Sequence, residues 1–245
     1  MWSNYIEQLY LYFIDFFIGF KEQFYLNFIE DHRYMYIVEG LGTTLIVTFM
    51  AVLIGIGIGF LVAIIRSTHD TTGKCVISNF FCKVYLTVIR GTPVVLQLLI
   101  IYFVIFGSVR VSKLLVAIIA FGINSGAYVA EIVRSGIMSI DKGQMEAGRS
   151  LGFNYTQTMR YIIMPQAFKN ILPALGNEFI VLLKETSVAG YIALQDLTMG
   201  GDIIRSQTYS AYFPLLVVAA IYLSMVMIFT YLVGRLERRL NSGRR

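Results

Sequence analysis

The sequence carries no charged side chain from Leu41 through Ile65. A membrane-spanning helix needs about 20 mostly apolar residues, because the hydrocarbon core of a bilayer is about 30 Å thick. Over the whole chain, 14% of the residues are charged and 57% are hydrophobic, whereas a soluble domain carries about 25% charged residues. These features predict an all-α membrane protein rather than a soluble domain.

Four more apolar segments follow, and together they predict about five transmembrane helices. The second segment is interrupted by Arg90-Gly91-Thr92-Pro93, and the fourth contains Lys184 and Glu185. A chain of 245 residues has no room for a separate soluble domain beside five or six spans. The predicted spans are approximately 39–65, 80–107, 113–133, 171–194 and 212–234.

Three regions are predicted along the chain. Residues 1–36 are rich in aromatic residues and are interrupted by charges such as Asp15, which favours an amphipathic helix in the membrane interface over a clean span. Residues 37–235 are the predicted transmembrane permease domain, and residues 236–245 are a basic tail. Within the first span, Gly55, Gly57 and Gly59 form a small-residue stripe that favours close helix packing.

The distribution of Lys and Arg predicts the orientation of the helices. If the N-terminus is outside and five helices alternate, segments 66–90, 134–169 and 235–245 hold fourteen Lys and Arg on the cytosolic side, and five lie outside. Cytosolic loops carry the excess of positive charge, so the prediction is N-out and C-in. If residues 1–20 also spanned the membrane, the N-terminus would lie inside and the five main helices would keep their direction.

The longest predicted cytosolic loop, about 134–170, reads as two short helices. The first contains Met145 to Leu151 and stops at Gly152, because glycine tolerates the sharp turn that ends a helix. The second contains Tyr155 to Ile163 and is predicted to end at Pro165.

The stretch from Gln144 to Pro165, QMEAGRSLGFNYTQTMRYIIMP, resembles the cytosolic coupling loop of ABC importer permeases. The family pattern is Glu-Ala-Ala, three residues, Gly, nine residues, then Ile, any residue, Leu-Pro. This chain has Gly in place of the second Ala and Met in place of Leu. The resemblance implies that the loop transmits ATPase motion to the membrane helices. Its matching positions are Glu146, Ala147, Gly148, Gly152 and Pro165.

Other segments are similar to the polar amino acid subfamily of these permeases, whose members import histidine, glutamate, glutamine, arginine, cystine and opines. They are 89–97, 126–136 and 183–187, and the resemblance extends over about 36–235. It implies a bacterial or archaeal-type inner membrane, a second permease subunit that is identical or related, two ATP-binding cassette subunits and an extracytoplasmic amino-acid-binding protein. No cofactor is expected in this chain, because the partner ATPase would bind ATP and Mg²⁺.

Ionisable and polar groups inside spans are costly and usually face a cavity or a partner. Backbone amides freed at a helix break, beside a cation, suit a carboxylate, whereas carboxylate and hydroxyl groups suit the ammonium group of an amino acid. The residues predicted to contact solute are Arg90, Thr92, Tyr128, Glu185, Thr186 and Ser187.

Structural alternatives stay open for several of these polar residues. Arg90 can instead anchor at the interface, Lys184 and Glu185 can form an intramembrane pair, and Glu131 and Arg134 lie three apart, where they can satisfy one another. Three more, Asn124, Ser125 and Tyr128, can serve either as interhelix hydrogen-bonding groups or as solute contacts.

Several other function classes find no support in the sequence. No G-x-x-x-x-G-K-[ST] phosphate loop occurs, so no nucleotide site of that kind is expected. Cys75, Cys82 and two isolated histidines show no metal-ligand spacing. The positive net charge is explained by topology rather than by nucleic acid. The alternatives to an importer subunit are a secondary transporter or channel that works without ATP, and an intramembrane enzyme.

Overall fold

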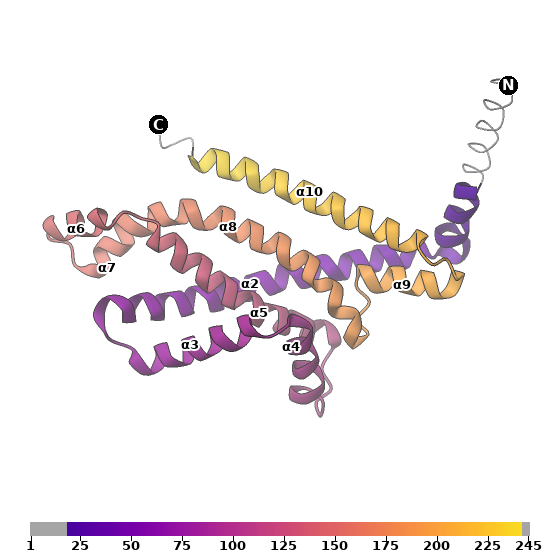
Figure 1. Cartoon of the computed structure of the whole chain (residues 1–245), viewed down its shortest axis with the longest axis horizontal. Helices are drawn as coiled ribbons and strands as arrows, with labels where there is room; N and C mark the ends of the chain where they lie inside the picture. Colours follow the sequence, from indigo (N-terminus) through magenta and orange to yellow (C-terminus); the bar gives the residue numbers. More distant parts are fainter. Residues whose placement is uncertain (1–18, 242–245) are drawn as a thin grey trace, which may run out of the picture.

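The computed structural model describes residues 19–241, and residues 1–18 and 242–245 lie outside the described part. The described residues form helices and connecting turns without any strand, which confirms the all-α prediction. Most of the long helices run roughly along one axis of an elongated bundle (Figure 1).

Two helices, α2 (Tyr34–Thr72) and α5 (Lys113–Met138), form the centre of the bundle. α2 extends beyond both ends of the predicted span. A Cβ added at Gly59 would lie 2.5 Å from Val129 Cγ1, and one added at Gly55 would lie 2.9 Å from Ser125 Cβ. Gly57 has no neighbouring atom within 4 Å of such a Cβ. Only two members of the predicted glycine stripe therefore serve the contact with α5.

The second predicted span is broken where its sequence suggested. α3 (Val76–Gly91) and α4 (Val94–Ile100), which continues into the π-helical turn η3 (Ile101–Ile105), meet at an angle of 110°. Pro93 occupies the N-cap of α4 in an extended conformation. A proline has no N–H to continue the hydrogen bonds of α3, so the axis changes at this residue.

The fourth predicted span is shifted toward the N-terminus. α8 (Met164–Glu185) begins earlier than residue 171, and the chain then tightens into the 3₁₀ segment η5 (Thr186–Ile192) instead of staying α-helical to 194. The prediction that Pro165 ends a helix is wrong, because this proline lies in the first turn of α8. Proline has no N–H to donate and a fixed φ that suits the first turn of an α-helix, so it is tolerated at this position.

The sequence did not suggest helix α9 (Leu197–Thr208), which precedes the long helix α10 (Phe213–Asn241). Its N-cap is Asp196, whose carboxylate accepts from the Met199 N–H at 2.9 Å and from the Thr198 N–H at 3.2 Å. α10 extends the last predicted span through residues 236–241.

Residues 19–24 are helical and continue into η1 (Tyr25–Ile29) and η2 (Glu30–His32). The side chain of Asn27 is fully buried and accepts a hydrogen bond from Thr208 Oγ1 at 2.8 Å. Phe28 packs in a cluster with Leu197 and Ile204 of α9. The described part of the N-terminal segment is thus attached to α9; the rest of the predicted segment, 1–18, lies outside the described residues.

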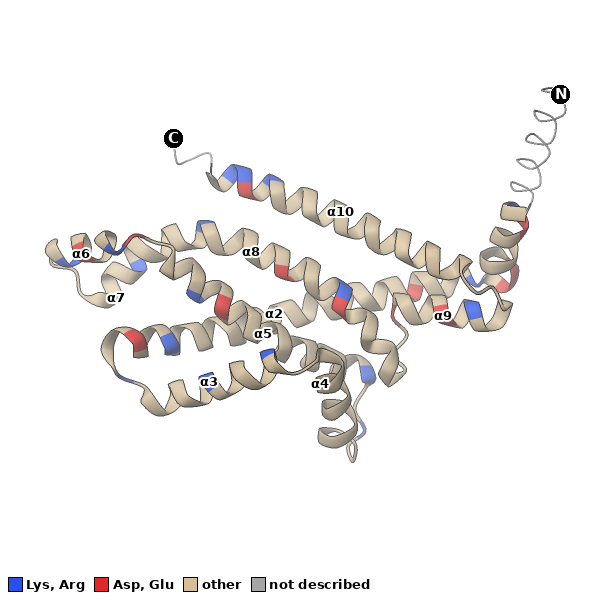
Figure 2. Cartoon of the chain, in the orientation of Figure 1, with Lys and Arg blue, Asp and Glu red and all other residues tan. Residues whose placement is uncertain are grey.

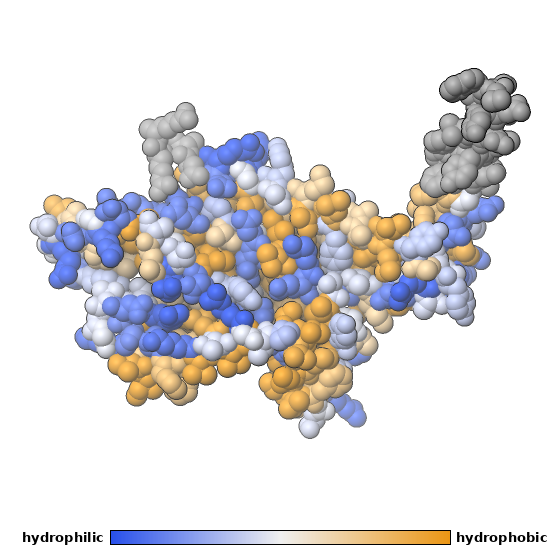
Figure 3. Space-filling model, viewed as in Figure 1, coloured by the Kyte–Doolittle hydropathy of each residue, from blue (hydrophilic) through white to orange (hydrophobic). Residues whose placement is uncertain are grey.

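Three described helices are long and apolar enough to cross a membrane: α2, α5 and α10. The bent pair of α3 and α4 makes a fourth candidate if it counts as one span. Charged residues are sparse along these helices (Figure 2). Apolar surface covers the edge formed by α3, α4 and η3 (Figure 3). Exposed apolar residues of these segments include Ile77, Phe80 and Val104. These surfaces identify a protein with several membrane-spanning helices.

Candidate functional site

Helices α3, α5 and α8 line an open cavity of about 450 Å³. Its wall combines a cation, two carboxylates and several small polar groups, which is an unusual mixture between apolar helices. The lining residues are Arg90, Tyr128, Glu131, Ile132, Ser135, Gly136, Ser139, Asn170, Ala174 and Glu178.

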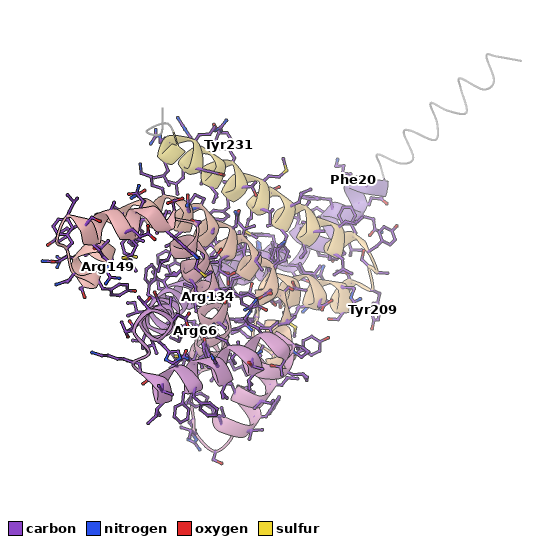
Figure 4. All side chains as sticks on the ribbon, turned by 60° about the vertical axis from the view of Figure 1, so that its left-hand side comes forward. Phe20, Arg66, Arg134, Arg149, Tyr209 and Tyr231 are labelled. Carbon is purple, nitrogen blue, oxygen red and sulfur yellow. The ribbon has the colours of Figure 1, made fainter. Side chains whose placement is uncertain are left out.

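At one side of the cavity, three arginines converge on Glu131. Arg134 donates to Glu131 Oε1 at 3.2 Å from Nε and at 2.9 Å from Nη2. Arg90 Nη1 of α3 lies 3.5 Å from Glu131 Oε2, and Arg66 Nη1 of α2 lies 3.9 Å from the same oxygen. Figure 4 shows the side chains of Arg66 and Arg134 in the same central region of the molecule. One carboxylate therefore joins three helices electrostatically.

The aromatic ring of Tyr128 lies beside the Arg90 guanidinium, whose carbon is 5.9 Å from the ring centroid. This is within the range of a cation–π contact. Arg90 remains 44% exposed, so its guanidinium has free donors for a further anion.

The second carboxylate of the cavity, Glu178 of α8, is nearly buried. Its Oε1 accepts a hydrogen bond from Ser125 Oγ of α5 at 2.9 Å. Glu185 lies seven residues further along α8, a spacing that places both carboxylates on one face of the helix. Of the two, Glu178 lines the cavity, so the α8 wall contributes one carboxylate and the α3 wall contributes Arg90.

The backbone groups exposed at the break between α3 and α4 find hydrogen-bond partners within the chain. Gln97 Nε2 donates to the carbonyl oxygens of Ile89 at 2.7 Å and Thr92 at 3.0 Å, and to Thr92 Oγ1 at 2.9 Å. Asn124 Nδ2 of α5 donates to Gln97 Oε1 at 2.9 Å. Irregular backbone at membrane depth is tolerated where such partners exist, so Gln97 and Asn124 hold the bend in place.

The structure separates the residues predicted to contact solute into two groups. Arg90 and Tyr128 line the cavity, and Thr92 lies at the adjacent bend. The other three follow one another at the end of α8. Thr186 is buried and donates to the Leu183 carbonyl at 2.8 Å, whereas Glu185 and Ser187 are half-buried. None of these three is among the described residues that line the cavity.

The structural alternatives have different outcomes. Asn124 and Ser125 both make interhelix hydrogen bonds, and Glu131 and Arg134 do pair. In the described structure, Lys184 and Glu185 form no ion pair within 4.0 Å.

Glu131 and Glu178 both lie inside predicted spans, and neither was assigned to solute contact. Sequence reasoning missed the cavity-lining pair Ser139 and Asn170 altogether; Asn170 Nδ2 donates to Ser139 Oγ at 2.7 Å. The seven-residue spacing between Glu178 and Glu185 could have predicted that both carboxylates lie on one face of α8.

A separate feature occupies the end of the bundle, where α6 (Lys142–Ser150) and α7 (Tyr155–Thr158) continue through η4 (Met159–Ile163) into α8. The end of α6 at Gly152 is confirmed: this residue has φ +85°, the Gly152 N–H donates to Arg149 O and the Phe153 N–H donates to Gly148 O. These bonds define a Schellman motif. Glu146 and Ala147 are exposed on α6, and Leu151 is 74% exposed.

Several known proteins are similar to this chain in sequence and in architecture. The sequence profile described as binding-protein-dependent transport system inner membrane component matches residues 76–242. The putative glutamine transport system permease protein GlnP of Rickettsia typhi is 37% identical over 210 residues, which cover 85% of this chain and 94% of that protein. The arginine transport system permease protein ArtQ of Bacillus subtilis is 37% identical over 215 residues, with the same coverage of 85% and 94%.

A crystal structure of an amino acid ABC transporter with histidines superimposes with a TM-score of 0.78. That chain is 43% identical, and the match covers 86% of this chain and 98% of that one. The relatives are permease components of transport systems rather than enzymes. Since the profile spans most of the described bundle and the relatives match nearly along their whole length, this chain belongs to the family of binding-protein-dependent transport system inner membrane components.

Proposed function

We propose that this chain is the transmembrane subunit of an ATP-driven importer of polar amino acids, basic ones included. The observation that carries the proposal is the cavity between α3, α5 and α8, which has a partly free guanidinium on one wall and the Glu178 carboxylate on another. A free amino acid carries a carboxylate and an ammonium group, and charge-assisted hydrogen bonds favour both partners. Relatives named for glutamine and arginine transport support the same solute class.

The proposed solute contacts combine residues predicted from sequence with residues found in the structure. Arg90 would bind the solute carboxylate, Tyr128 would shield it from the side, and Glu178 would bind an ammonium or guanidinium group. Thr92 would orient the backbone at the bend. Glu185, Thr186 and Ser187 would line the path beyond α8 rather than the cavity itself.

The proposed topology has five spans, namely α2, the α3–α4 pair, α5, α8 and α10, with the N-terminus outside and the C-terminus inside. The α2–α3 turn, α6, α7 and the C-terminal end of α10 lie at the same end of the bundle, which supports this assignment (Figure 1). Most Lys and Arg residues fall in the segments 66–90, 134–169 and 235–245, which lead to or from that end of the bundle, as expected for cytosolic loops. In this arrangement residues 1–36 lie at the outer interface, 37–235 form the permease domain with the loop 134–170 inside, and 236–245 form a cytosolic tail.

The proposed contact with the ATPase is the α6–α7 loop. The exposed Glu146, Ala147 and Leu151 would enter a groove of the partner, and Gly152 would set the turn between the two helices. Gly148 and Pro165 would serve the internal packing of the loop. A rigid docking element of this kind can transmit a domain motion.

The proposed assembly lies in the inner membrane of the cell. It contains a second permease subunit, identical or related, two ATP-binding cassette subunits that bind ATP and Mg²⁺, and an extracytoplasmic binding protein that delivers the solute. The competing function is an ATP-independent secondary transporter or channel. It accounts for the cavity, but it assigns no role to the α6–α7 loop.

The two functions differ in their energy source. The chain is reconstituted in proteoliposomes with the ATPase and binding protein encoded beside it, and uptake of labelled arginine, glutamine and histidine is measured with internal ATP or with ionic gradients alone. If the chain is an importer subunit, uptake is expected only with ATP, and the variants Glu146→Ala and Gly152→Val should lose it. The control Glu237→Ala, which changes an exposed residue of α10, should show normal uptake. Uptake driven by an ion gradient without ATP would establish the secondary transporter instead.

A further inference from the structure

A second cavity, of about 470 Å³, opens between α2 and α3. Its described lining contains three cations, a hydroxyl group and no carboxylate. The lining residues are Arg66, Lys83, Leu86, Thr87, Arg90 and Gly91. Arg90 lines both this cavity and the solute cavity.

The positive charge around this second cavity exceeds the nearby negative charge. Glu131 is shared by three arginines, but its hydrogen bonds go to Arg134. Arg66 and Arg90 reach Glu131 only at 3.9 and 3.5 Å. Arg66 Nε is buried and has no hydrogen-bond partner. Arg66 is the partly buried member, with 19% side-chain exposure. A partly buried cation is costly without a counter-charge, so an additional anion beside Arg66 is favoured.

The position of the cluster favours a lipid. Arg66 directly follows the charge-free run of α2, which places it near the end of the hydrocarbon region. Lys83, Thr87 and Arg90 recur at helical spacing along one side of α3. The adjoining side of α3 exposes apolar residues, with Phe80 61% and Val84 44% exposed. Acyl chains can lie along that side while the headgroup enters the cavity.

We propose that Arg66, Lys83 and Thr87 bind the phosphate group of an anionic phospholipid. Guanidinium groups bind phosphate through paired N–H donors, the ammonium of Lys83 adds a point charge and the Thr87 hydroxyl donates a further hydrogen bond. Basic pockets between membrane helices on the cytoplasmic side are suited to such headgroups. The site rests on the proposed orientation only for its assignment to the inner leaflet, and it is independent of the transported solute.

The test uses the assembled transporter in detergent, with native mass spectrometry of bound phosphatidylglycerol and phosphatidylcholine added at equal concentration. Phosphatidylglycerol is expected to be retained preferentially. Lys83→Gln should lower its retention by about fivefold, since one cation near a headgroup contributes about 1 kcal/mol. Lys83→Arg should restore retention, and Lys74→Gln, an exposed lysine outside the cavity, should leave it unchanged.

Equal retention of the two lipids, or no effect of Lys83→Gln, would overturn the proposal. A third arm adds inorganic phosphate. If phosphate binds in a Lys83-dependent manner while no phosphatidylglycerol is retained, the lipid source is refuted and a free anion is the ligand. Because no arm measures uptake, failure of this site is distinguishable from failure of the proposed transport function.

Discussion

The Cα of Gly148 packs directly against the side chain of Thr158. A Cβ built on Gly148 would lie 2.5 Å from Thr158 Cγ2 and 2.8 Å from its Oγ1. The coupling-loop pattern that residues 144–165 resemble has alanine at this position, and Thr158 gives the departure a local cause. Thr158 is fully buried and fills the space that an alanine methyl group would need.

Gly148→Ala is therefore expected to destabilise the α6–α7 loop, although alanine is the better helix former. Overpacking of this kind costs about 1–3 kcal/mol. Thermal unfolding and co-purification of the ATPase measure the effect. Combining the change with Thr158→Ala should recover part of the loss, because the clashing atoms are removed. If the double variant is as unstable as the sum of the single variants, the two residues are not coupled.

Gly59 and Gly57 lie in the same helix, α2, but only Gly59 packs against a neighbouring helix, so Gly57 serves as its matched control. Gly59→Ala should lower the melting temperature, because its Cβ would meet Val129 Cγ1 at 2.5 Å and the Ala130 nitrogen at 2.8 Å. Gly57→Ala has open space around it and should be neutral or stabilising by about 0.5–1 kcal/mol, the intrinsic preference of helices for alanine. Equal responses of the two variants would contradict the packing of α2 on α5.

Sequence patterns located the helices well where one residue type determines the outcome. The break at Arg90–Pro93 was predicted because proline and glycine disrupt helical hydrogen bonds, and the stop at Gly152 because glycine adopts the left-handed conformation readily. The direction of the bend was not predictable. It depends on Gln97 and Asn124, whose hydrogen bond connects two segments that are distant in the sequence.

Gln97 is expected to be the main support of the bend. Gln97→Leu removes the donor to the Ile89 and Thr92 carbonyls and leaves Asn124 without its acceptor. Each unsatisfied buried group costs about 1–3 kcal/mol, so the melting temperature should fall sharply. Gln195→Leu, which removes an exposed hydrogen bond to Glu39, serves as the control. A similar small change in both variants would show that Gln97 is dispensable.

Glu131 is expected to hold α2, α3 and α5 together by charge. Glu131→Gln leaves Arg66, Arg90 and Arg134 without their shared carboxylate. Removing one partner of a fully buried ion pair costs about 3–5 kcal/mol. Because Glu131 is 30% exposed, we expect a smaller loss in the free energy of unfolding, about 1–3 kcal/mol.

The control for Glu131 is Asp202→Asn, which breaks an exposed pair with Arg205 that contributes less than about 1 kcal/mol. Adding Arg134→Gln to Glu131→Gln should restore part of the stability by removing one unpaired cation. Unfolding curves that coincide for Glu131→Gln and the unmodified protein would exclude the electrostatic role.

The convergence on Glu131 shows the limit of sequence reasoning at the site. The Arg134 partner was predictable from its spacing on one helix, whereas Arg66 and Arg90 reach the same carboxylate from other helices. Helix α9 was missed for a different reason. It is short and carries Asp202 and Arg205, so its sequence contains no long apolar run that would predict a helix. The one residue that indicated a helix start was Asp196, a typical N-cap residue.

The most direct test of the account is ATP-driven uptake of labelled arginine by the reconstituted transporter carrying Glu178→Gln. Glutamine can keep the hydrogen bond from Ser125 Oγ, so the change removes the charge with little change of shape. A charge-assisted hydrogen bond contributes about 1.5–3 kcal/mol. Half-maximal uptake should therefore require at least about tenfold more solute-loaded binding protein, while Glu237→Gln behaves normally. Uptake by Glu178→Gln that matches the unmodified transporter at every concentration would contradict the assignment of this cavity to the solute.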